Sequence, residues 1–371
     1  MTPSHDAQYS LVVQHMLACG GGASHTQLAS WGVESADVAR MLRRGVIRRT
    51  RRGYYVLPLT GDPSDRWQRE RSAHLREVSA IATSGTVTGL RSAALAWDLP
   101  VSSVPKRPEV VRPQRSGSWP GVRVVRRHLP SHHIAVINGI PVTSIEWTAV
   151  DIALDLPTPL ALITVDAALR RGASQPQMLR ILSDRGSVRG CREARQTLDW
   201  ADGHSESPLE SRGRGELMLQ GVPRPWSNVS LRLGAVEFRT DHWWDGLGIT
   251  GEADGRGKYD GPTAPTDPVW TEKLRQEWLE EELGILVVRY VDREIHRGPV
   301  EVEARWRRRE ARRTHQLWVP PSALEIFQRP FPGSSDPIRW FRHRDEGEAH
   351  FEDRIGRQMC LTFLSGMELG P

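Results

Sequence analysis

The stretch VEFRTDHWWDGLGITGEAD, residues 236–254, predicts a β-hairpin. Val236, Phe238 and Thr240 alternate with polar neighbours, which is typical of a strand with one buried face. Asp245-Gly246 is a dipeptide that favours hairpin turns, so the chain is expected to return as a second strand that ends with the stretch. The pattern therefore indicates two adjacent antiparallel strands.

Two carboxylates are expected to converge in this hairpin, because Asp241 on the first strand would lie near Glu252 on the second. Carboxylate oxygens are ligands that Mg²⁺ prefers, with water and substrate phosphate completing the shell. The pattern therefore predicts a metal-dependent nuclease site in which Asp241 and Glu252 bind Mg²⁺ or Mn²⁺. The alternative is that Asp245-Gly246 and Asp254-Gly255 serve only the backbone geometry of turns.

Lysine is scarce in this chain. Lysine and arginine together number 50, but only Lys106, Lys258 and Lys273 are lysines. Lysine is a compact charge whose pKa shifts readily, whereas arginine stays protonated. Lys258 and Lys273 follow the carboxylates in sequence and are candidates to position a water or offset charge.

Length and composition narrow the class of protein. The chain has 371 residues, which predicts two or three domains. A net charge of +5 and a pI near 9.4 favour polyanionic partners. Cys19, Cys191 and Cys360 show no CxxC spacing, so neither a zinc ribbon nor a disulfide framework is indicated. No signal peptide or membrane-spanning run is evident, so we expect a soluble, cytoplasmic protein without a membrane partner.

The expected fold class is α/β, in the form of a multi-domain α+β chain with four parts. These parts are a winged helix-turn-helix over 8–60, an α+β scaffold or partner-binding unit over 62–203, an αβββαβ endonuclease-like domain over 205–313, and a poorly ordered tail over 314–371. The tail is expected to be poorly ordered because its prolines and mixed charges show no sustained period.

The first part has the pattern of a winged helix. Apolar positions at helical spacing predict a first helix through Leu11, Val12, His15 and Met16, a second over 26–31, and a third that Ser35 caps, with Val38, Met41 and Leu42 on one face. Strands are expected over 46–49 and 54–57, joined by a turn at 51–53.

Arginines gather on the third helix and the wing. The helix is expected to present Asp37, Arg40, Arg43 and Arg44 outward, where a recognition helix meets the major groove, while wing arginines reach phosphates. The predicted DNA-binding residues are Arg40, Arg43, Arg44, Arg48, Arg49, Arg51 and Arg52. The alternative is a merely solvated face.

The second part shows no catalytic constellation. Helices are predicted over 67–82, 91–98, 146–154, 159–171 and 177–185, and strands over 109–112 and 122–126. Asp151, Asp155 and Asp166 are expected to be surface or capping carboxylates on these helices.

The third part predicts a helix, three strands, a helix and a strand. The expected ranges are a helix from Ser205 or Ser207 to Leu219, strands near 227–233, 236–244 and 248–254, a helix over 269–283, and a strand over 285–290. A further arginine-rich helix over 300–313 is expected to be a solvated or phosphate-facing surface.

The N-terminal two thirds of the chain resemble AbiEi-type antitoxins of type IV toxin–antitoxin systems. The resemblance lies in Leu28, the 43–49 wing with Gly53-Tyr54-Tyr55, the 91–97 segment, and 139–144 leading to Thr148-Ala-Val-Asp151. Trp147 departs from the pattern, because relatives usually have arginine there. The resemblance implies a DNA-binding repressor of its own promoter and a nucleotidyltransferase-like toxin as partner.

The final third resembles the small endonuclease-like domain related to very-short-patch-repair (Vsr) enzymes, within the PD-(D/E)xK superfamily. The resemblance lies in the 205–210 segment, Asp241 and Glu252-x-Asp254-Gly255, and both resemblances together cover roughly residues 8 to 310. It implies that Glu210 is the helix carboxylate, Asp241 the first metal ligand and Glu252 the second. Asp254 stands where the superfamily usually has lysine, so Lys258, where related domains often have histidine, is assigned that role, with Lys273 as the alternative.

Two functions therefore stay open. In the first, the winged helix directs a metal-dependent endonuclease to nucleic acid, with Glu210, Asp241, Glu252, Asp254 and Lys258 as the catalytic set. Mg²⁺ would lower the pKa of a bound water for in-line attack on phosphorus. In the second, the chain is an antitoxin and transcriptional repressor whose nuclease fold is inactive. DNA binding is common to both.

Overall fold

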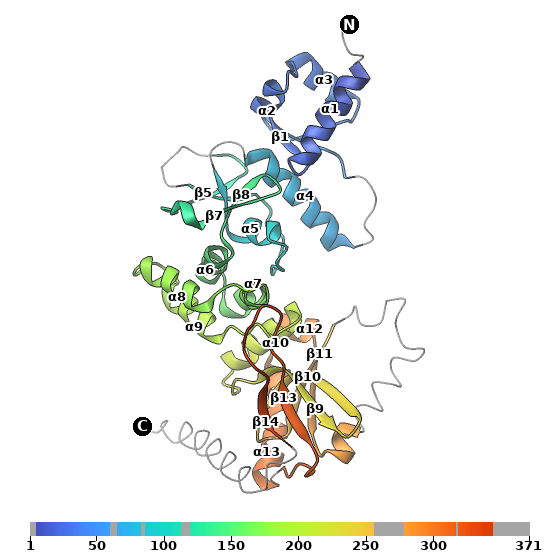
Figure 1. Ribbon diagram of the computed structural model, residues 1–371, viewed down its shortest axis with the longest axis vertical. Helices are drawn as coiled ribbons and strands as arrows, with labels where there is room; N and C mark the ends of the chain where they lie inside the picture. The colour runs from blue at the N-terminus through green and yellow to red at the C-terminus, as the bar shows by residue number, and fades with distance from the viewer. Residues whose placement is uncertain are drawn as a thin grey trace. The chain divides into compact units, whose positions relative to one another are not determined.

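The structure is a computed structural model, and it describes residues 5–59, 65–82, 86–112, 119–255, 278–316 and 318–343. The chain divides into two compact units, one of Met1–Ala168 with Ala173–Asp199 and the other of Leu169–Gly172 with Trp200–Pro371 (Figure 1). Both units combine helices with β-sheets. The multi-domain α+β class is therefore confirmed.

The first unit begins with three helices and a small sheet, as predicted (Figure 1). The helices are α1 (His5–Ala18), α2 (His25–Ser30) and α3 (Ser35–Arg43), and the strands are β1 (Gly22–Ser24), β2 (Arg48–Arg51) and β3 (Tyr54–Val56). The strand order is β1-β3-β2 with antiparallel pairs. This is a winged helix whose wing is the β2–β3 hairpin.

A single apolar core holds the winged helix together. Tyr9, Met16, Leu28, Met41 and Ile47 are among its buried members. Two details differ from the sequence prediction. Leu11 is 54% exposed, because α1 buries Tyr9, Val12 and Met16 on its inner face. Helix α3 is capped by Glu34, whereas Ser35 was the predicted cap.

Helix α4 (Arg66–Ile81) packs against the small sheet. Gly22 of β1 lies so close that a Cβ atom there would be 2.2 Å from the carbonyl oxygen of Arg76. The Arg76 guanidinium donates to the carbonyl of Leu57 at 2.6 Å and to that of Pro58. The wing is thus attached to the helix that begins the next part of the unit.

A mixed five-stranded sheet forms the rest of the first unit, in the order β6-β5-β4-β8-β7. Its strands are β4 (Val87–Thr88), β5 (Glu109–Arg112), β6 (Arg123–Arg126), β7 (Ile134–Ile137) and β8 (Ile140–Thr143), with the 3-10 turn η1 (Ser131–His133) before β7. The sequence indicated only β5 and β6. Strand β4 has only two residues, too few to show alternation, whereas β7 and β8 are as long as β5 and β6 but were not predicted.

Five helices of the described residues follow or connect these strands. They are α5 (Leu90–Ala96), α6 (Ile145–Asp155), α7 (Thr158–Arg170), α8 (Gln175–Asp184) and α9 (Cys191–Trp200). The sequence predicted all of them except α9, within two residues at most ends. Their inner faces are rich in alanine, valine and leucine, as in α6, where Ala149, Val150 and Ile152 are fully buried.

The second unit is built on a six-stranded sheet in the order β12-β11-β10-β9-β13-β14. Its strands are β9 (Trp226–Leu233), β10 (Val236–Trp244), β11 (Ile249–Asp254), β12 (Leu286–Val291), β13 (Glu325–Gln328) and β14 (Arg339–Arg342). Only β11 and β12 run parallel. The predicted hairpin is confirmed as β10 and β11, which pair Trp244 with Ile249 across a turn where Gly246 and Gly248 have positive φ.

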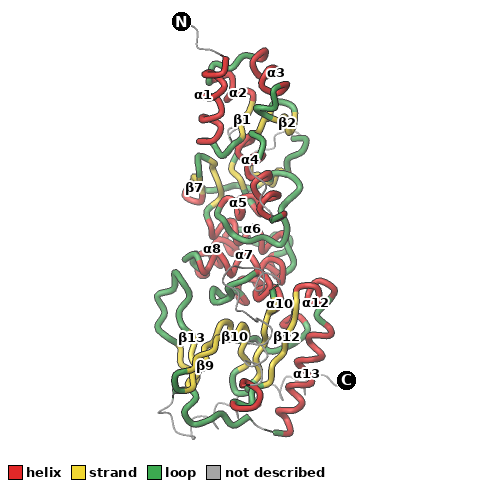
Figure 2. The backbone as a smooth tube through the Cα atoms, turned by 90° about the vertical axis from the view of Figure 1, so that its right-hand side faces the viewer, coloured by secondary structure: helices red, strands yellow, loops and turns green. Residues whose placement is uncertain are grey.

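Helices α10 (Pro208–Leu219), α12 (Asp292–Arg297) and α13 (Val300–His315) accompany this sheet, and Figure 2 shows α13 beside β12. One core on this side includes Trp244, Tyr290 and Trp306. A second core includes Trp243, Val287 and Trp318. Of the predicted helix over 269–283, the described residues form the π-helical turn η3 (Trp278–Glu282), and the remainder lies largely outside the described residues.

The expectation of a poorly ordered tail is wrong for residues 318–343. Strand β13 extends the sheet by pairing with β9, and β14 pairs with β13. Ile326 and Phe327 are both buried although they are neighbours, so no alternation marks the strand in the sequence. The partner that creates β13 is about a hundred residues earlier in the chain, which a local pattern cannot reveal.

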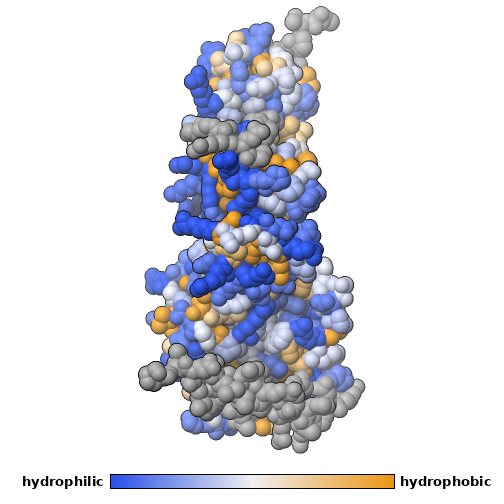
Figure 3. All heavy atoms as spheres, turned by 90° about the vertical axis from the view of Figure 1, so that its left-hand side faces the viewer, coloured by the Kyte–Doolittle hydropathy of each residue, from blue (hydrophilic) through white to orange (hydrophobic). Residues whose placement is uncertain are grey.

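In the face that Figure 3 shows, hydrophilic side chains cover most of the area and apolar side chains form small groups. Among the described residues, no helix is long and apolar enough to cross a membrane.

Candidate nucleic-acid interface and carboxylate site

The winged helix places five of the seven predicted DNA-binding arginines on its surface. Arg43 and Arg44 are exposed at the end of α3, Arg48 and Arg49 are exposed on β2, and Arg52 is exposed at the wing turn. Arg44 also stacks over the ring of Tyr9, with 5.6 Å between Cζ and the ring centroid. A helix end and a hairpin therefore present cations together, which suits a phosphate backbone.

Asp37 does not point outward as expected. It is 6% exposed, and its carboxylate accepts from the backbone N–H of Glu34 at 3.3 Å and from Arg40 Nη2 at 2.5 Å. The physical reason is that Asp37 lies in the first turn of α3, where a carboxylate satisfies helix N–H groups. Arg40 is thus half-buried beside Asp37, and its role in DNA binding stays a prediction.

Arg51 on the wing, like Arg40 on α3, has an ion-pair partner within the unit. Its Nη2 lies 2.7 Å from Glu77 Oε2 on α4, and its Nη1 donates to the Gly121 carbonyl at 2.8 Å. Its side chain is 15% exposed. These bonds hold Arg51 against the middle of the unit, away from a ligand that would approach the wing.

In the second unit, Asp241 and Glu252 lie on adjacent strands as predicted. The register pairs His242 with Gly251, so the two acidic residues follow as the next opposed pair. Asp241 Oδ2 accepts from the backbone N–H of Ala253 at 2.7 Å. Glu252 is 3% exposed and Thr250 Oγ1 donates to its Oε1 at 3.3 Å. Both carboxylates are therefore fixed by the hairpin.

Glu210 joins these two from the first turn of α10. It is 7% exposed, and its Oε2 accepts from the Glu206 backbone N–H at 2.8 Å and from Asn228 Nδ2 at 2.9 Å. Burial, and then the charge of Asp241, raise the pKa of Glu210. Asn228 has a φ of 53°, a left-handed conformation that asparagine tolerates, where its amide bonds Glu210.

A buried tyrosine, Tyr290, senses the charge of the three carboxylates, and no motif in the sequence marks it. Tyr290 is 1% exposed, and its pKa is raised well above the ordinary value, first by burial and then by Asp241, Glu210 and Glu252. Its Oη lies 2.6 Å from His242 Nε2. Burial lowers the pKa of His242 to about 3, so the imidazole is neutral. The charges of Asp241, Glu210 and Glu252 thus all favour the neutral form of this buried hydroxyl group.

Asp254 has a different neighbour. Its Oδ2 lies 3.6 Å from Arg289 Nη1 on β12. The register places Arg289 directly opposite Glu252 in the parallel pair of β11 and β12. Lys258 and Lys273, the sequence-based candidates for a catalytic lysine, lie outside the described residues.

The residues present fit a two-carboxylate site for a hard divalent cation. Mg²⁺ is usually held by one or two carboxylates together with water and substrate phosphate, which matches Asp241 and Glu252 as neighbours on one hairpin. In the part of the chain that the structure describes, no three His, Cys, Asp or Glu side chains are arranged to hold a metal ion. Glu210 lies close enough to Asp241 for the charge of Asp241 to raise its pKa.

The carboxylates of the first unit are not surface groups as expected. Asp151 is 2% exposed and pairs with Arg127 and with Arg185 Nη1, the latter at 2.6 Å. Arg185 also stacks over Trp147 at 4.1 Å. Asp155 binds Arg123, and Asp166 is fully buried. Helical spacing alone could not show that other parts of the unit cover the helix faces that carry these carboxylates.

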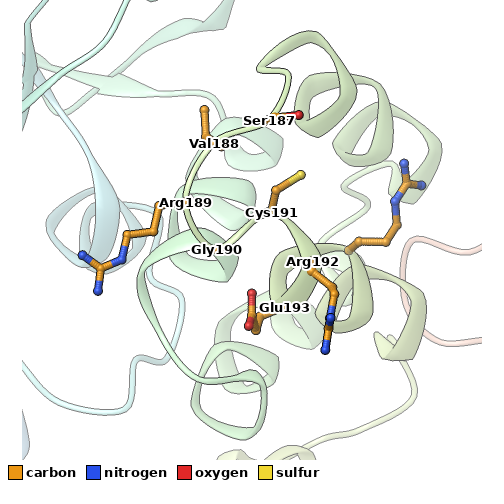
Figure 4. Close-up of a pocket in the computed structure, with 8 residues that line it drawn as sticks. Ser187, Val188, Arg189, Gly190, Cys191, Arg192 and Glu193 are labelled. Atoms are coloured by element: carbon orange, nitrogen blue, oxygen red, sulfur yellow. The ribbon is translucent and has the colours of Figure 1, made fainter.

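A shallow surface hollow lies where the loop Ser187–Gly190 enters α9. Figure 4 shows that the side chains of Arg189 and Arg192 point away from one another around Cys191. The hollow has no converging polar groups, and we assign it no ligand.

Comparison with known proteins found a family model that resembles part of the chain. Residues 18–200 match the family model described as the AbiEi antitoxin C-terminal domain. This segment contains the wing and the five-stranded sheet, and it ends before the carboxylate site. The likeness of residues 205–313 to PD-(D/E)xK endonucleases stays a prediction from sequence motifs.

Two relatives come from Mycobacterium tuberculosis, the uncharacterized proteins MT2308 and Rv2248. Each is 30% identical to this chain over 174 residues, which is 46% of this chain. The chain spans about three fifths (61%) of the length of these relatives. The crystal structure of the RV2827C protein from Mycobacterium tuberculosis aligns with 60% of this chain and 84% of that chain, at 20% identity and a TM-score of 0.31.

Proposed function

We propose, on the premise that residues 18–200 match the AbiEi antitoxin C-terminal domain, that this chain is a DNA-binding antitoxin and transcriptional repressor. The observation that supports the proposal most is the group of exposed arginines on α3 and the wing. The winged-helix core holds these two elements together. A duplex would take the end of α3 in its major groove, and Arg48, Arg49 and Arg52 would contact flanking phosphates.

The anchored wing supports this proposal further. Arg51 and Arg76 attach the small sheet to α4 through the Glu77 carboxylate and the Leu57 carbonyl. A hairpin held in this way presents its remaining arginines in a fixed geometry, which reduces the entropy lost on binding. The mixed sheet and helices after α4 are then available as the surface for a protein partner, which we propose to be a nucleotidyltransferase-like toxin.

The test is a binding and neutralisation experiment with the whole chain. We expect retarded migration of duplex DNA from the chain's own promoter, and rescue of growth when the chain is produced together with a nucleotidyltransferase-like protein from a neighbouring gene. The triple variant Arg43→Ala, Arg48→Ala, Arg49→Ala should lose DNA binding and keep rescue. Unchanged DNA binding in this variant would refute the assignment of the wing.

A second candidate function belongs to the carboxylate site of the second unit. Asp241 and Glu252 lie opposite one another on the β10–β11 hairpin, and buried Glu210 of α10 lies close enough to Asp241 for that charge to raise the pKa of Glu210. We propose that this unit hydrolyses phosphodiester bonds of nucleic acid with Mg²⁺ or Mn²⁺. Asp241 and Glu252 would hold the ion, which would supply Lewis-acid activation of water. Glu210 would set the charge of the site, while Lys258 stays the proposed cation that positions water.

This second function is tested by cleavage of supercoiled plasmid and single-stranded DNA. Metal-dependent cleavage that Asp241→Ala and Glu252→Ala each abolish would support it. Arg232→Ala in the same sheet serves as the matched control, because Arg232 pairs with Glu325 away from the carboxylates. Absence of cleavage by the parent chain on every substrate, with duplex binding retained, would leave the repressor function alone.

A further inference from the structure

The carboxylate site needs a cation in addition to a metal ion. Asp241 and Glu252 lie opposite one another on β10 and β11, and Asp254 follows two residues after Glu252, so a phosphodiester that approaches this end of the hairpin meets several acidic groups. A divalent ion offsets only part of this charge. A site that admits a phosphate therefore requires a fixed positive side chain close to the same carboxylates.

Arg289 is placed to supply that charge. It lies on β12 in register with Glu252 of β11, and residues in register on neighbouring strands project to the same face of a sheet. Asp254 is two residues after Glu252 on β11, so it projects to that face as well. Glu252, Asp254 and Arg289 thus lie on one face of the sheet.

Asp254 holds the guanidinium of Arg289 by charge, with 3.6 Å between Oδ2 and Nη1. The side chains of Arg289 and Asp254 are 29% and 20% exposed, so a ligand can reach the pair. The two strands that carry these residues limit the movement of the pair. A guanidinium is a planar fork with five N–H donors, and it can contact a carboxylate and a phosphate at once. A lone carboxylate at position 254 would repel the phosphate.

We infer that Arg289, positioned by Asp254, binds the non-bridging oxygens of a nucleic-acid phosphate at the carboxylate site, and that Asp254 is a positioning residue instead of a metal ligand. This inference rests on the proposed phosphodiesterase function, and it names the residue that recognises the substrate.

The experiment measures affinity in the full-length chain whose wing is silenced by Arg43→Ala, Arg48→Ala and Arg49→Ala. The probe is a fluorescent single-stranded oligonucleotide, titrated with Ca²⁺, which supports binding without turnover, and with EDTA. We expect Arg289→Ala to weaken the Ca²⁺-dependent affinity about tenfold or more, as loss of a charge-assisted contact does. Arg289→Lys should retain part of the affinity. Asp254→Ala should lose nearly as much as Arg289→Ala.

A double variant separates positioning from direct contact. If Asp254 acts only through Arg289, Asp254→Ala with Arg289→Ala binds as weakly as Arg289→Ala alone. Additive losses would overturn the positioning role. Thermal unfolding checks each variant, and Arg289→Gln and Asp254→Asn replace the alanine variants if those do not fold. Arg232→Ala, which removes a similar ion pair in the same sheet, should leave the affinity unchanged.

The outcome distinguishes this inference from the function on which it rests. If the parent binds with Ca²⁺ through Arg289 but cleaves nothing with Mg²⁺ or Mn²⁺, the hydrolase proposal fails and the phosphate contact stands. If the parent cleaves and Arg289→Ala binds and cleaves normally, the contact is refuted and the hydrolase stands. A wing-silenced parent without Ca²⁺-dependent affinity also overturns the contact.

Discussion

Arg51 of strand β2 forms an ion pair with Glu77 of helix α4, with 2.7 Å between Nη2 and Oε2. The same guanidinium donates to the carbonyl of Gly121. A residue that the sequence places among DNA-contacting arginines is therefore a connection between the wing and the rest of its unit. Arg51 has the same local sequence pattern as Arg48 and Arg49, and only its contacts in the structure show that its role is different.

Replacing Arg51 should affect stability more than DNA binding. Arg51→Ala leaves a partly buried carboxylate and a carbonyl without their donor, which costs about 1–2 kcal/mol. Urea unfolding measures this loss. Arg48→Ala, at an exposed position on the same strand, is the control and should unfold like the parent. Equal stability of the two variants would contradict the role given to Arg51.

The exposed wing arginines should determine how DNA affinity depends on salt. Each phosphate contact that is removed lowers the slope of log affinity against log salt concentration by about 1. We expect this reduction in Arg48→Ala and Arg49→Ala, measured by fluorescence anisotropy. Arg66→Ala on α4, whose side chain is 83% exposed and pairs with Glu70, is the matched control. A reduction of the same size in Arg66→Ala would indicate a general charge effect.

His74 should make the stability depend on pH. It is 6% exposed, its Nε2 lies 2.8 Å from Ser92 Oγ, and burial lowers its pKa from 6.5 to about 4, with Arg91 and Arg51 adding to the effect. The unfolded chain binds the proton first on acidification. The stabilising contribution is therefore complete above pH 6.5 and is lost as the pH falls towards 4.

This contribution amounts to about 2 kcal/mol between pH 7 and pH 5. It is measured as the difference in urea unfolding free energy at the two pH values, which should be smaller in His74→Gln than in the parent. His128→Gln, at an exposed histidine, should behave as the parent does. An undiminished pH difference in His74→Gln would show that His74 is not responsible.

Gly213 of α10 should not tolerate alanine. In most helices Gly→Ala stabilises by about 0.5–1 kcal/mol. Here a Cβ atom would lie 2.5 Å from the Tyr290 hydroxyl, and the ring is confined by its bond to His242. We expect Gly213→Ala to destabilise by about 1–3 kcal/mol.

Thermal unfolding decides the sign of the Gly213→Ala effect. Leu219→Ala, on an exposed position of the same helix, is the control and should change little. A higher melting temperature for Gly213→Ala would mean that Tyr290 can move away from α10.

Much of the fold follows from local sequence patterns. Helical spacing predicted α1 to α8, α10 and α13, and the turn dipeptide Asp245-Gly246 predicted the hairpin of β10 and β11. These features depend on interactions between residues close in sequence, such as i to i+4 contacts and turn conformations. The hairpin also placed Asp241 opposite Glu252, because register follows once a turn is fixed.

Pairing over long distances decided the rest. Strand β13 exists because β9, nearly a hundred residues earlier, offers an edge, and β4, β7 and β8 are short strands that only the assembled sheet stabilises. Local periodicity cannot report such partners, since neither their distance along the chain nor their register is encoded nearby.

By itself, the sequence determined the α+β class, the winged helix, and the order of helix and strands around Asp241 and Glu252. Only the tertiary structure decided which charged residues are covered. It buried Asp37 and Asp151 with arginine partners, attached Arg51 to Glu77, and set Arg289 beside Asp254. The physical reason is that a charged side chain has the same local pattern whether water or an opposite charge stabilises it, and only the packed neighbours distinguish the two.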